Sequence, residues 1–136
     1  MQRRNFIRQS GLLTAGFLLH QQLLGATTLT EDKIISIGII GCGDRGTGIM
    51  KVMKELPDLY KVTAICDTLD FRLTNATKIE TAKIYTNYLK LLEDKSIDAV
   101  VIATPLNLHF EIAKAALQAN KHVYLEKAMT HTIAQA

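Results

Sequence analysis

A glycine-rich segment that directly follows an apolar run constrains the fold of this chain more than any other feature. The run, residues 34–40, is rich in isoleucine, which is typical of a strand buried on both faces of a parallel sheet. Gly41, Gly43 and Gly46 follow it with G-x-G-x-x-G spacing, and a helical pattern begins near Arg45. This order of strand, glycines and helix is typical of a turn that binds the pyrophosphate of a dinucleotide at a helix N-terminus.

Each glycine has its own expected role. Gly41 permits a tight turn, Gly43 lets the backbone approach a pyrophosphate, and Gly46 lets the helix pack against the strand. A second apolar run, 62–66, ends at Asp67, where a carboxylate accepts hydrogen bonds from an adenosine ribose. A carboxylate there also repels a 2′-phosphate, so we predict NAD, with NADP as the less favoured dinucleotide. The alternative is a glycine-rich turn without a ligand, with Asp67 as a helix N-cap.

The rest of the chain alternates short apolar runs with helical patterns. This alternation predicts an α/β fold, a Rossmann-like doubly wound parallel sheet with right-handed crossovers and ligands at the carboxyl ends of its strands. The strands are expected at 34–40, 62–66, 82–86, 97–104 and 122–125, and a last helix is expected from Thr130. The residues that fall at the carboxyl ends are Gly41–Gly46, Asp67, Thr104, Pro105, Glu126 and Lys127.

Residues 1–26 have the layout of a secretory leader. Three arginines and no acidic residue precede an apolar stretch, Gly11–Leu24, and two small residues follow it. The segment Arg3–Arg8 resembles the twin-arginine export signal, which implies export of an already folded protein. We therefore expect a periplasmic or extracytoplasmic location reached through the export machinery, with membrane tethering if the leader is not cleaved. An amphipathic first helix is the alternative.

After the leader we expect a linker at 27–33 and a nucleotide-binding domain at 34–136, incomplete at its C-terminus. The chain is 48% hydrophobic and 21% charged, which excludes a disordered polypeptide. Its formal net charge of +3 comes from the leader, because the 13 basic residues outside it balance 13 acidic ones. No electrostatic argument therefore favours a nucleic acid or an anionic membrane surface as a partner.

Three further segments carry a resemblance to a known family. They are Cys66–Thr68, Ala103–His109 and Ala113–Thr130, and they resemble the Gfo/Idh/MocA oxidoreductases. The resemblance covers the chain from about Ile34 to its end, which is nearly all of that family's nucleotide-binding domain. It implies a Rossmann domain that binds NAD(P) and works on sugars or polyols.

The resemblance also implies roles for individual residues. The segment that matches Thr104, Pro105 and His109 lines the nicotinamide side of the cofactor in this family. Glu126 and Lys127 match the first two residues of an E-K-P motif, whose lysine contacts cofactor and substrate and helps to orient or polarise the reacting group. Lys127 is thus the candidate catalytic residue. The candidate cofactor-binding residues are Gly41, Gly43, Asp44, Arg45, Gly46, Asp67, Thr104, Pro105, His109, Glu126 and Lys127.

Two departures from the family affect these expectations. Ala128 stands where the motif has proline, which gives the backbone more freedom and leaves Lys127 less well placed. The family's second α/β domain, which supplies most of the substrate pocket, is absent, so we expect a fragment or a truncated gene product without turnover of its own. Lys127 as a solvated lysine and His109 as a solvent-facing histidine at a helix start are the alternatives.

Three functions are therefore compatible with the sequence. The first is the NAD(P)-binding domain of an oxidoreductase that acts on a sugar or polyol. The second is a fragment of a redox-neutral, NAD-dependent glycosidase, because an exported enzyme must regenerate its bound cofactor in each turnover and some exported relatives cleave α-N-acetylgalactosaminides in this way. The third is a non-catalytic nucleotide-binding module. Cys42 and Cys66 are expected to be buried thiols, and no spacing of histidines and cysteines predicts a metal site.

Overall fold

The computed structural model describes residues 33–136. The expected leader at 1–26 and all of the expected linker except residue 33 lie outside the described residues. The export signal, its cleavage and the location that depends on them therefore stay predictions.

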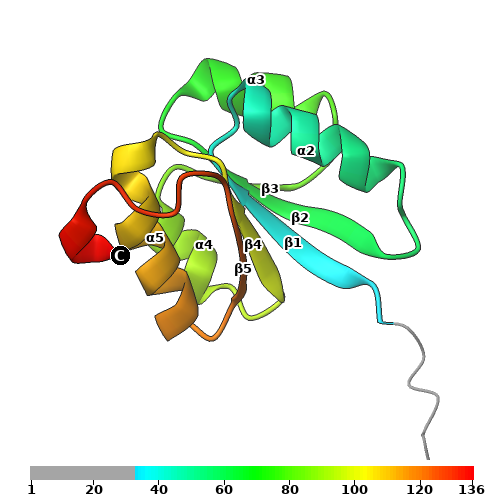
Figure 1. The fold of residues 1–136 in the computed structure, drawn as a ribbon. Coiled ribbons are helices and arrows are strands. Elements are labelled where there is room, and N and C mark those ends of the chain that lie inside the picture. The colour runs from blue at the N-terminus through cyan, green and yellow to red at the C-terminus, as the bar shows by residue number, and fades with distance from the viewer. Residues whose placement is uncertain (1–32) are drawn as a thin grey trace, which may run out of the picture. The chain divides into compact units, whose positions relative to one another are not determined.

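The described residues form one five-stranded sheet in which every neighbouring pair of strands is parallel. The strand order is β3-β2-β1-β4-β5, which places the strand before the glycines at the centre (Figure 1). This order, with a helical segment between successive strands, confirms the predicted Rossmann-like doubly wound sheet. The strands are β1 (Ile35–Ile40), β2 (Tyr60–Cys66), β3 (Lys83–Tyr85), β4 (Ala99–Ile102) and β5 (His122–Leu125).

Helices cover both faces of the sheet. In Figure 1 α2 and α3 lie over one face, and α4 and α5 lie over the other. The helices are α2 (Asp44–Lys54), α3 (Asp70–Thr77), α4 (Tyr88–Glu93) and α5 (Leu106–Gln118). No helix in this part of the chain combines the length and the apolar character that a membrane crossing requires.

The sheet separates two apolar cores. Ile39 belongs to the core that includes Met50 of α2 and Leu73 of α3, whereas Ile40 belongs to the core that includes Ile112 of α5. Ile39 is 0% and Ile40 is 2% exposed, although their side chains point to opposite faces. The isoleucine run is therefore buried on both faces, as its composition predicted.

Two predicted elements differ most from the observed ones. The strand expected at 97–104 is shorter, because the backbone turns toward α5 after Ala103 and Pro105, the N-cap of that helix, has no N–H to continue a ladder. The helix expected from Thr130 is only a 3₁₀ turn, Ile133–Gln135. It begins later because Thr132 and Gln135 form a capping box, in which each side chain bonds the other residue's backbone.

The glycine turn between β1 and α2 is shaped by two close approaches. Gly41 has a φ of +95°, and a Cβ built there would lie 2.6 Å from the carbonyl oxygen of Ala103 in the neighbouring β4–α5 turn. A Cβ on Gly46 would overlap the carbonyl oxygen of Gly41. The absence of a side chain at Gly41 therefore lets the end of β1 lie against the β4–α5 turn, and its absence at Gly46 lets the start of α2 lie against the end of β1.

Replacing Gly46 with alanine is expected to lower the free energy of unfolding by about 3 kcal/mol or more, because the obstructing atom is backbone and α2 would have to move. Urea titration followed by circular dichroism measures this change. Gly48→Ala is the matched control, since a Cβ there meets nothing within 4 Å. Alanine at this position should stabilise the helix by about 0.5–1 kcal/mol, so equal stabilities of the two variants would contradict the packing.

Candidate functional site

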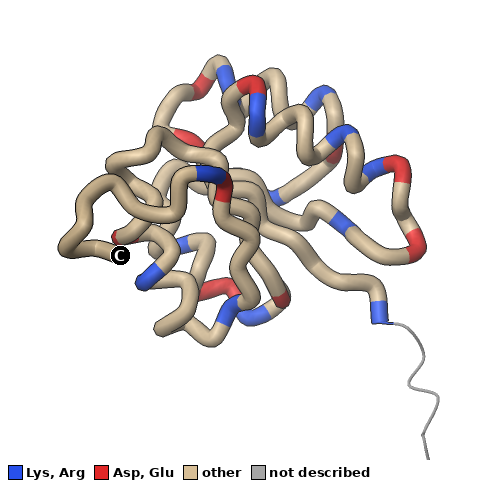
Figure 2. Tube along the Cα trace, in the orientation of Figure 1, with Lys and Arg blue, Asp and Glu red and all other residues tan. Residues whose placement is uncertain are grey.

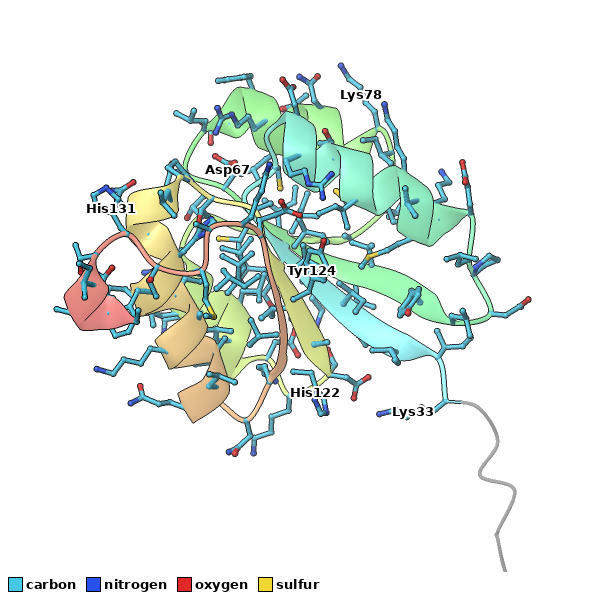
Figure 3. All side chains as sticks on the ribbon, in the orientation of Figure 1. Lys33, Asp67, Lys78, His122, Tyr124 and His131 are labelled. Atoms are coloured by element: carbon cyan, nitrogen blue, oxygen red, sulfur yellow. The ribbon has the colours of Figure 1, made fainter. Side chains whose placement is uncertain are left out.

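The carboxyl ends of β1, β2 and β4 meet around an open cavity of about 500 Å³. Its lining includes Gly41, Asp67, Thr104 and Pro105, which the sequence placed at strand ends. In Figure 3 Asp67 lies at this end of the sheet, and Lys33 and His122 lie at the opposite end. β1 and β4 are neighbours on either side of the point where the strand order reverses, which is where ligands bind in open α/β sheets.

Asp67 is a buried carboxylate that holds the glycine turn. Its Oδ2 accepts a hydrogen bond from the backbone N–H of Cys42 at 2.8 Å, and its Oδ1 accepts one from the N–H of Leu69 at 3.0 Å. The N-cap of α3 is Leu69, so the alternative that Asp67 caps a helix is wrong. Because Asp67 is only 7% exposed, it joins the end of β2 to the turn after β1 inside the fold.

Gly43 borders open space at the start of α2. A Cβ built there meets only the guanidinium of Arg72, at 3.7 Å, which is ordinary contact. Gly43 is the N-cap of α2 and supplies no side-chain cap, so the first N–H groups of the helix are left to other partners. A cavity of about 210 Å³ adjoins them, lined in part by Gly43, Asp44 and Arg72. The fold thus does not require glycine here, whereas a close anionic ligand would.

Arg72 is a functional candidate that the sequence motifs did not assign to the site. It lines both cavities, and its Nη1 lies 3.8 Å from Asp67 Oδ2. Its side chain is 39% exposed, so the guanidinium is accessible from the 210 Å³ cavity as well as paired with the carboxylate. Its position in the first turn of α3 was visible in the sequence, but its approach to Gly43 depends on the packing of α3 beside α2.

Arg45 reaches across the site to the end of β5. Its Nη2 donates to Glu126 Oε1 at 2.7 Å, and the hydroxyl of Tyr124 donates to the same oxygen at 3.1 Å. The bond from Arg45 lowers the pKa of Glu126, and the same bond raises the pKa of Arg45. Arg45 and Glu126, both predicted to bind cofactor, therefore bind each other in this structure.

Lys127 is exposed and follows Glu126 at the end of β5. Within residues 33–136 no hydrogen bond or ion pair holds its ammonium group. It borders an open hollow together with Arg45, Tyr124 and Glu126. The structure thus places Lys127 beside the cofactor-binding candidates, and the solvated lysine stays an open alternative to its catalytic role.

His109 points into the protein, so the alternative of a solvent-facing histidine is wrong. It is 1% exposed, and its ring nitrogens lie 2.8 Å from the carbonyl oxygen of Ala128 and 2.9 Å from that of Thr104. The sequence held a signal for this burial, because His109, Ile112 and Ala116 share one helical face and all three are buried. His109 therefore contacts the backbone of Thr104 and Ala128 from inside the fold.

Thr104 has a polar atom without a partner in the described structure. Its Oγ1 is buried and makes no hydrogen bond with any residue there, although Thr104 lines the 500 Å³ cavity. A buried hydroxyl of this kind costs free energy unless a ligand or water completes it. This observation fits a bound group at the carboxyl end of β4.

The two cysteines are buried free thiols, as predicted. Burial, followed by the charge of Asp67, raises the pKa of Cys42 to about 12 and that of Cys66 to about 11. Both thiols therefore stay protonated and poorly nucleophilic near neutral pH. Among the described residues no three histidine, cysteine or acidic side chains group as metal ligands would. Basic and acidic residues are interspersed along the described chain (Figure 2).

Comparisons with known proteins agree with this geometry. A family model described as an oxidoreductase family with an NAD-binding Rossmann fold matches residues 35–136. The chain belongs to this family, Gfo/Idh/MocA, which confirms the resemblance found in the sequence. The prediction of NAD as the dinucleotide is confirmed for the family to which the chain belongs.

Individual relatives carry two kinds of names. The chain is 37% identical over 109 residues to a glycosyl hydrolase family 109 protein of Shewanella amazonensis, covering 73% of this chain and 24% of that protein. It is 34% identical over 103 residues to an inositol 2-dehydrogenase of Salmonella paratyphi B, covering 74% and 30%. The chain thus spans between a quarter and a third of the length of these relatives.

A solved structure shows the same fold. The WlbA dehydrogenase from Bordetella pertussis, in complex with NADH and UDP-GlcNAcA, superposes with a TM-score of 0.72 at 29% identity. The match covers 76% of this chain and 31% of that one. The fold of this chain therefore occurs in a dehydrogenase that was crystallised with the reduced dinucleotide.

Proposed function

We propose that this chain is the NAD-binding part of an oxidoreductase that acts on a sugar or polyol. The observation that carries the proposal is the combination of an open backbone at Gly43 with an uncapped helix N-terminus. Close packing within the fold explains the glycines at positions 41 and 46. No packing contact among the described residues requires glycine at position 43. A pyrophosphate there would receive the N–H groups and the positive end of the α2 dipole.

The described residues also fit the remaining parts of a dinucleotide. Asp67 and Arg72 border the cavity on the β2 side, where an adenosine ribose would lie. Thr104 and Pro105 border it on the β4 side, and the unpartnered hydroxyl of Thr104 is available to a nicotinamide amide. When bound, NAD would supply hydride transfer at its nicotinamide ring. The cavity extends across β2, β1 and β4, as a dinucleotide requires.

In this proposal Lys127 orients or polarises the oxygen of the substrate. Its exposed ammonium group at the end of β5 is free to meet a second ligand beside the nicotinamide side of the cavity. The substrate would be carbohydrate-like, because relatives named for inositol and for sugar chemistry share this domain. We further propose that turnover needs residues beyond those described, since the matched relatives are several times longer.

A redox-neutral glycosidase is the second candidate, and the names of the glycosyl hydrolase family 109 relatives favour it. In that reaction a sugar hydroxyl would be oxidised to a ketone by hydride transfer to bound NAD, and the acidified neighbouring C–H would lose its proton as the glycosidic bond is eliminated. Water would then add across the resulting double bond, and hydride would return to the ketone. The two candidates differ in redox balance. A dehydrogenase converts NAD to NADH with its product, whereas a glycosidase releases sugar without net NADH. A non-catalytic module would bind NAD and do neither.

Gly43→Ala is expected to weaken NADH binding by about tenfold or more, because the added methyl group would occupy the space of the pyrophosphate. Its free energy of unfolding should stay within about 0.5 kcal/mol of the unmodified chain, since the methyl group meets only a flexible guanidinium. NADH fluorescence titration and urea unfolding measure the two quantities. Gly48→Ala serves as the control for adding a methyl group to α2. Unchanged NADH affinity in a folded Gly43→Ala variant would refute the proposed site.

NADH is expected to bind about tenfold more tightly than NADPH, because the buried carboxylate of Asp67 repels a 2′-phosphate. The charge of Arg72, 3.8 Å from that carboxylate, limits the preference to this modest size. Parallel titrations of one protein preparation with both reduced dinucleotides measure the ratio. Equal affinities would mean that Asp67 serves the glycine turn alone and selects no cofactor.

We also propose that residues 1–26 direct export by the twin-arginine route. The support is the sequence Arg3–Arg8 and the apolar stretch that follows it. Changing Arg3 and Arg4 together to lysine should keep the protein in the cytoplasm, because the charge is retained while the arginine pair is lost. Fractionation of a bacterial host that expresses either form measures this effect. Equal export of both forms would contradict the proposed route.

A further inference from the structure

The ring of His109 lies between two backbone carbonyl oxygens that come from opposite sides of it. Nδ1 is 2.8 Å from the oxygen of Ala128, beyond β5, and Nε2 is 2.9 Å from the oxygen of Thr104, in the β4–α5 turn. Each oxygen belongs to a segment of the proposed site. Ala128 directly follows Lys127, and Thr104 lines the 500 Å³ cavity.

These contacts make the ring a hydrogen-bond donor to at least one of the two carbonyls. A carbonyl oxygen can only accept a hydrogen bond, and an imidazole carries a proton on at least one of its nitrogens. Which nitrogen donates depends on the tautomer, but in either tautomer the ring bonds one of the two segments and lies against the other.

The two carbonyl oxygens are the polar groups that the ring contacts. Charged side chains stand on both elements that hold the ring: Glu111 and Lys114 on α5, and Glu126 and Lys127 beyond β5. In the part of the chain that the structure describes, none of the four bonds the ring. Glu126 is instead bonded to Arg45 and Tyr124. The partial negative charges of two carbonyl dipoles therefore face the ring from both sides.

Few other hydrogen bonds hold the segment that follows Lys127. The ladder with β4 ends where the N–H of Glu126 donates to the carbonyl of Ile102 at 3.1 Å. Within the described residues, the bond from His109 is the one that ties Ala128–Thr130 to another element. It acts at the position where the family has proline and where alanine leaves the backbone freer.

We infer that His109 is a positioning residue, whose two ring nitrogens clamp the Lys127 segment to the β4–α5 turn. It is buried and does not line the 500 Å³ cavity, so it acts through Lys127 and Thr104. Only the role of the clamp, which is to position Lys127 for catalysis, rests on the proposed function. The clamp itself is a property of the unliganded chain.

The first test is the protonation of the ring in the full 136-residue chain. Histidine labelled with ¹⁵N gives a long-range ¹H–¹⁵N spectrum that separates a ring held in one fixed state from one that averages between its tautomers. The His109 signals, identified by their loss in His109→Gln, are expected to show a ring held in one fixed state, unlike the exposed His122. A His109 ring that averages between its tautomers as an exposed histidine does would overturn the inference. If His109→Gln does not fold, assignment through the backbone of the unmodified chain replaces it.

The second test is hydrogen exchange of the Lys127 segment. His109→Gln keeps one donor group and can reach only one carbonyl, so amides of Lys127–Thr130 should exchange about tenfold faster or more, while those of β1 are unchanged. His122→Gln, an exposed histidine at the other end of the sheet, is the matched control. Unchanged exchange in a folded His109→Gln variant would overturn the clamp.

Neither test uses a dinucleotide, so the inference and the proposed function can fail separately. A chain with a fixed ring and a protected segment that binds no NADH would refute the function and leave the clamp. A chain that binds NADH but has an averaging ring and an unprotected segment would refute the clamp and leave the function.

Discussion

The hydrogen bond between Asp67 and the backbone of Cys42 is the contact on which the rest of the site depends. It fixes the turn after β1 to the end of β2, and a carboxylate at 7% exposure has little access to water that could replace this partner. The positions of Gly43, of the first turn of α2 and of Arg72 all follow from that turn. A single buried group thus links the sheet, which is held by apolar packing, to the polar edge where a ligand would bind.

A second set of contacts joins the other half of the site to this turn. Gly41 lies against Ala103 of the β4–α5 turn, Arg45 reaches Glu126 beyond β5, and His109 joins Thr104 to Ala128. The first two contacts cross the point where the strand order reverses, and the third joins the segments that follow β4 and β5. The proposed cofactor cavity is therefore bordered by segments that are braced against one another, although they come from four separate parts of the sequence.

The fold was predictable because its signals are local. The isoleucine run, the spacing of the glycines and the alternation of strands and helices each depend on neighbouring residues, and they defined the sheet and its central turn. The helix expected from Thr130 was wrong because a capping pair at Thr132 decides where the last turn begins. Burial of His109 was also readable, since it shares the helical face of Ile112 and Ala116.

The partners within the site were not predictable in the same way. Asp67 was expected to face a ribose, and only the packing of β2 beside β1 shows that both its oxygens also serve the backbone. The pairing of Arg45 with Glu126 joins residues 81 positions apart, and no sequence period connects them. The acceptors of His109 are backbone atoms, which no side-chain pattern can reveal.

The distance along the chain between these partners has a kinetic consequence. Residues 25 and 81 positions apart must meet before the glycine turn and the end of β5 take their places. Contacts between residues so far apart form late in folding, because the chain between the partners must first be ordered at a cost in entropy. A partly folded chain therefore has the glycine sequence but not the binding turn. A dinucleotide would bind only the folded molecules and, by mass action, would shift the folding equilibrium toward them.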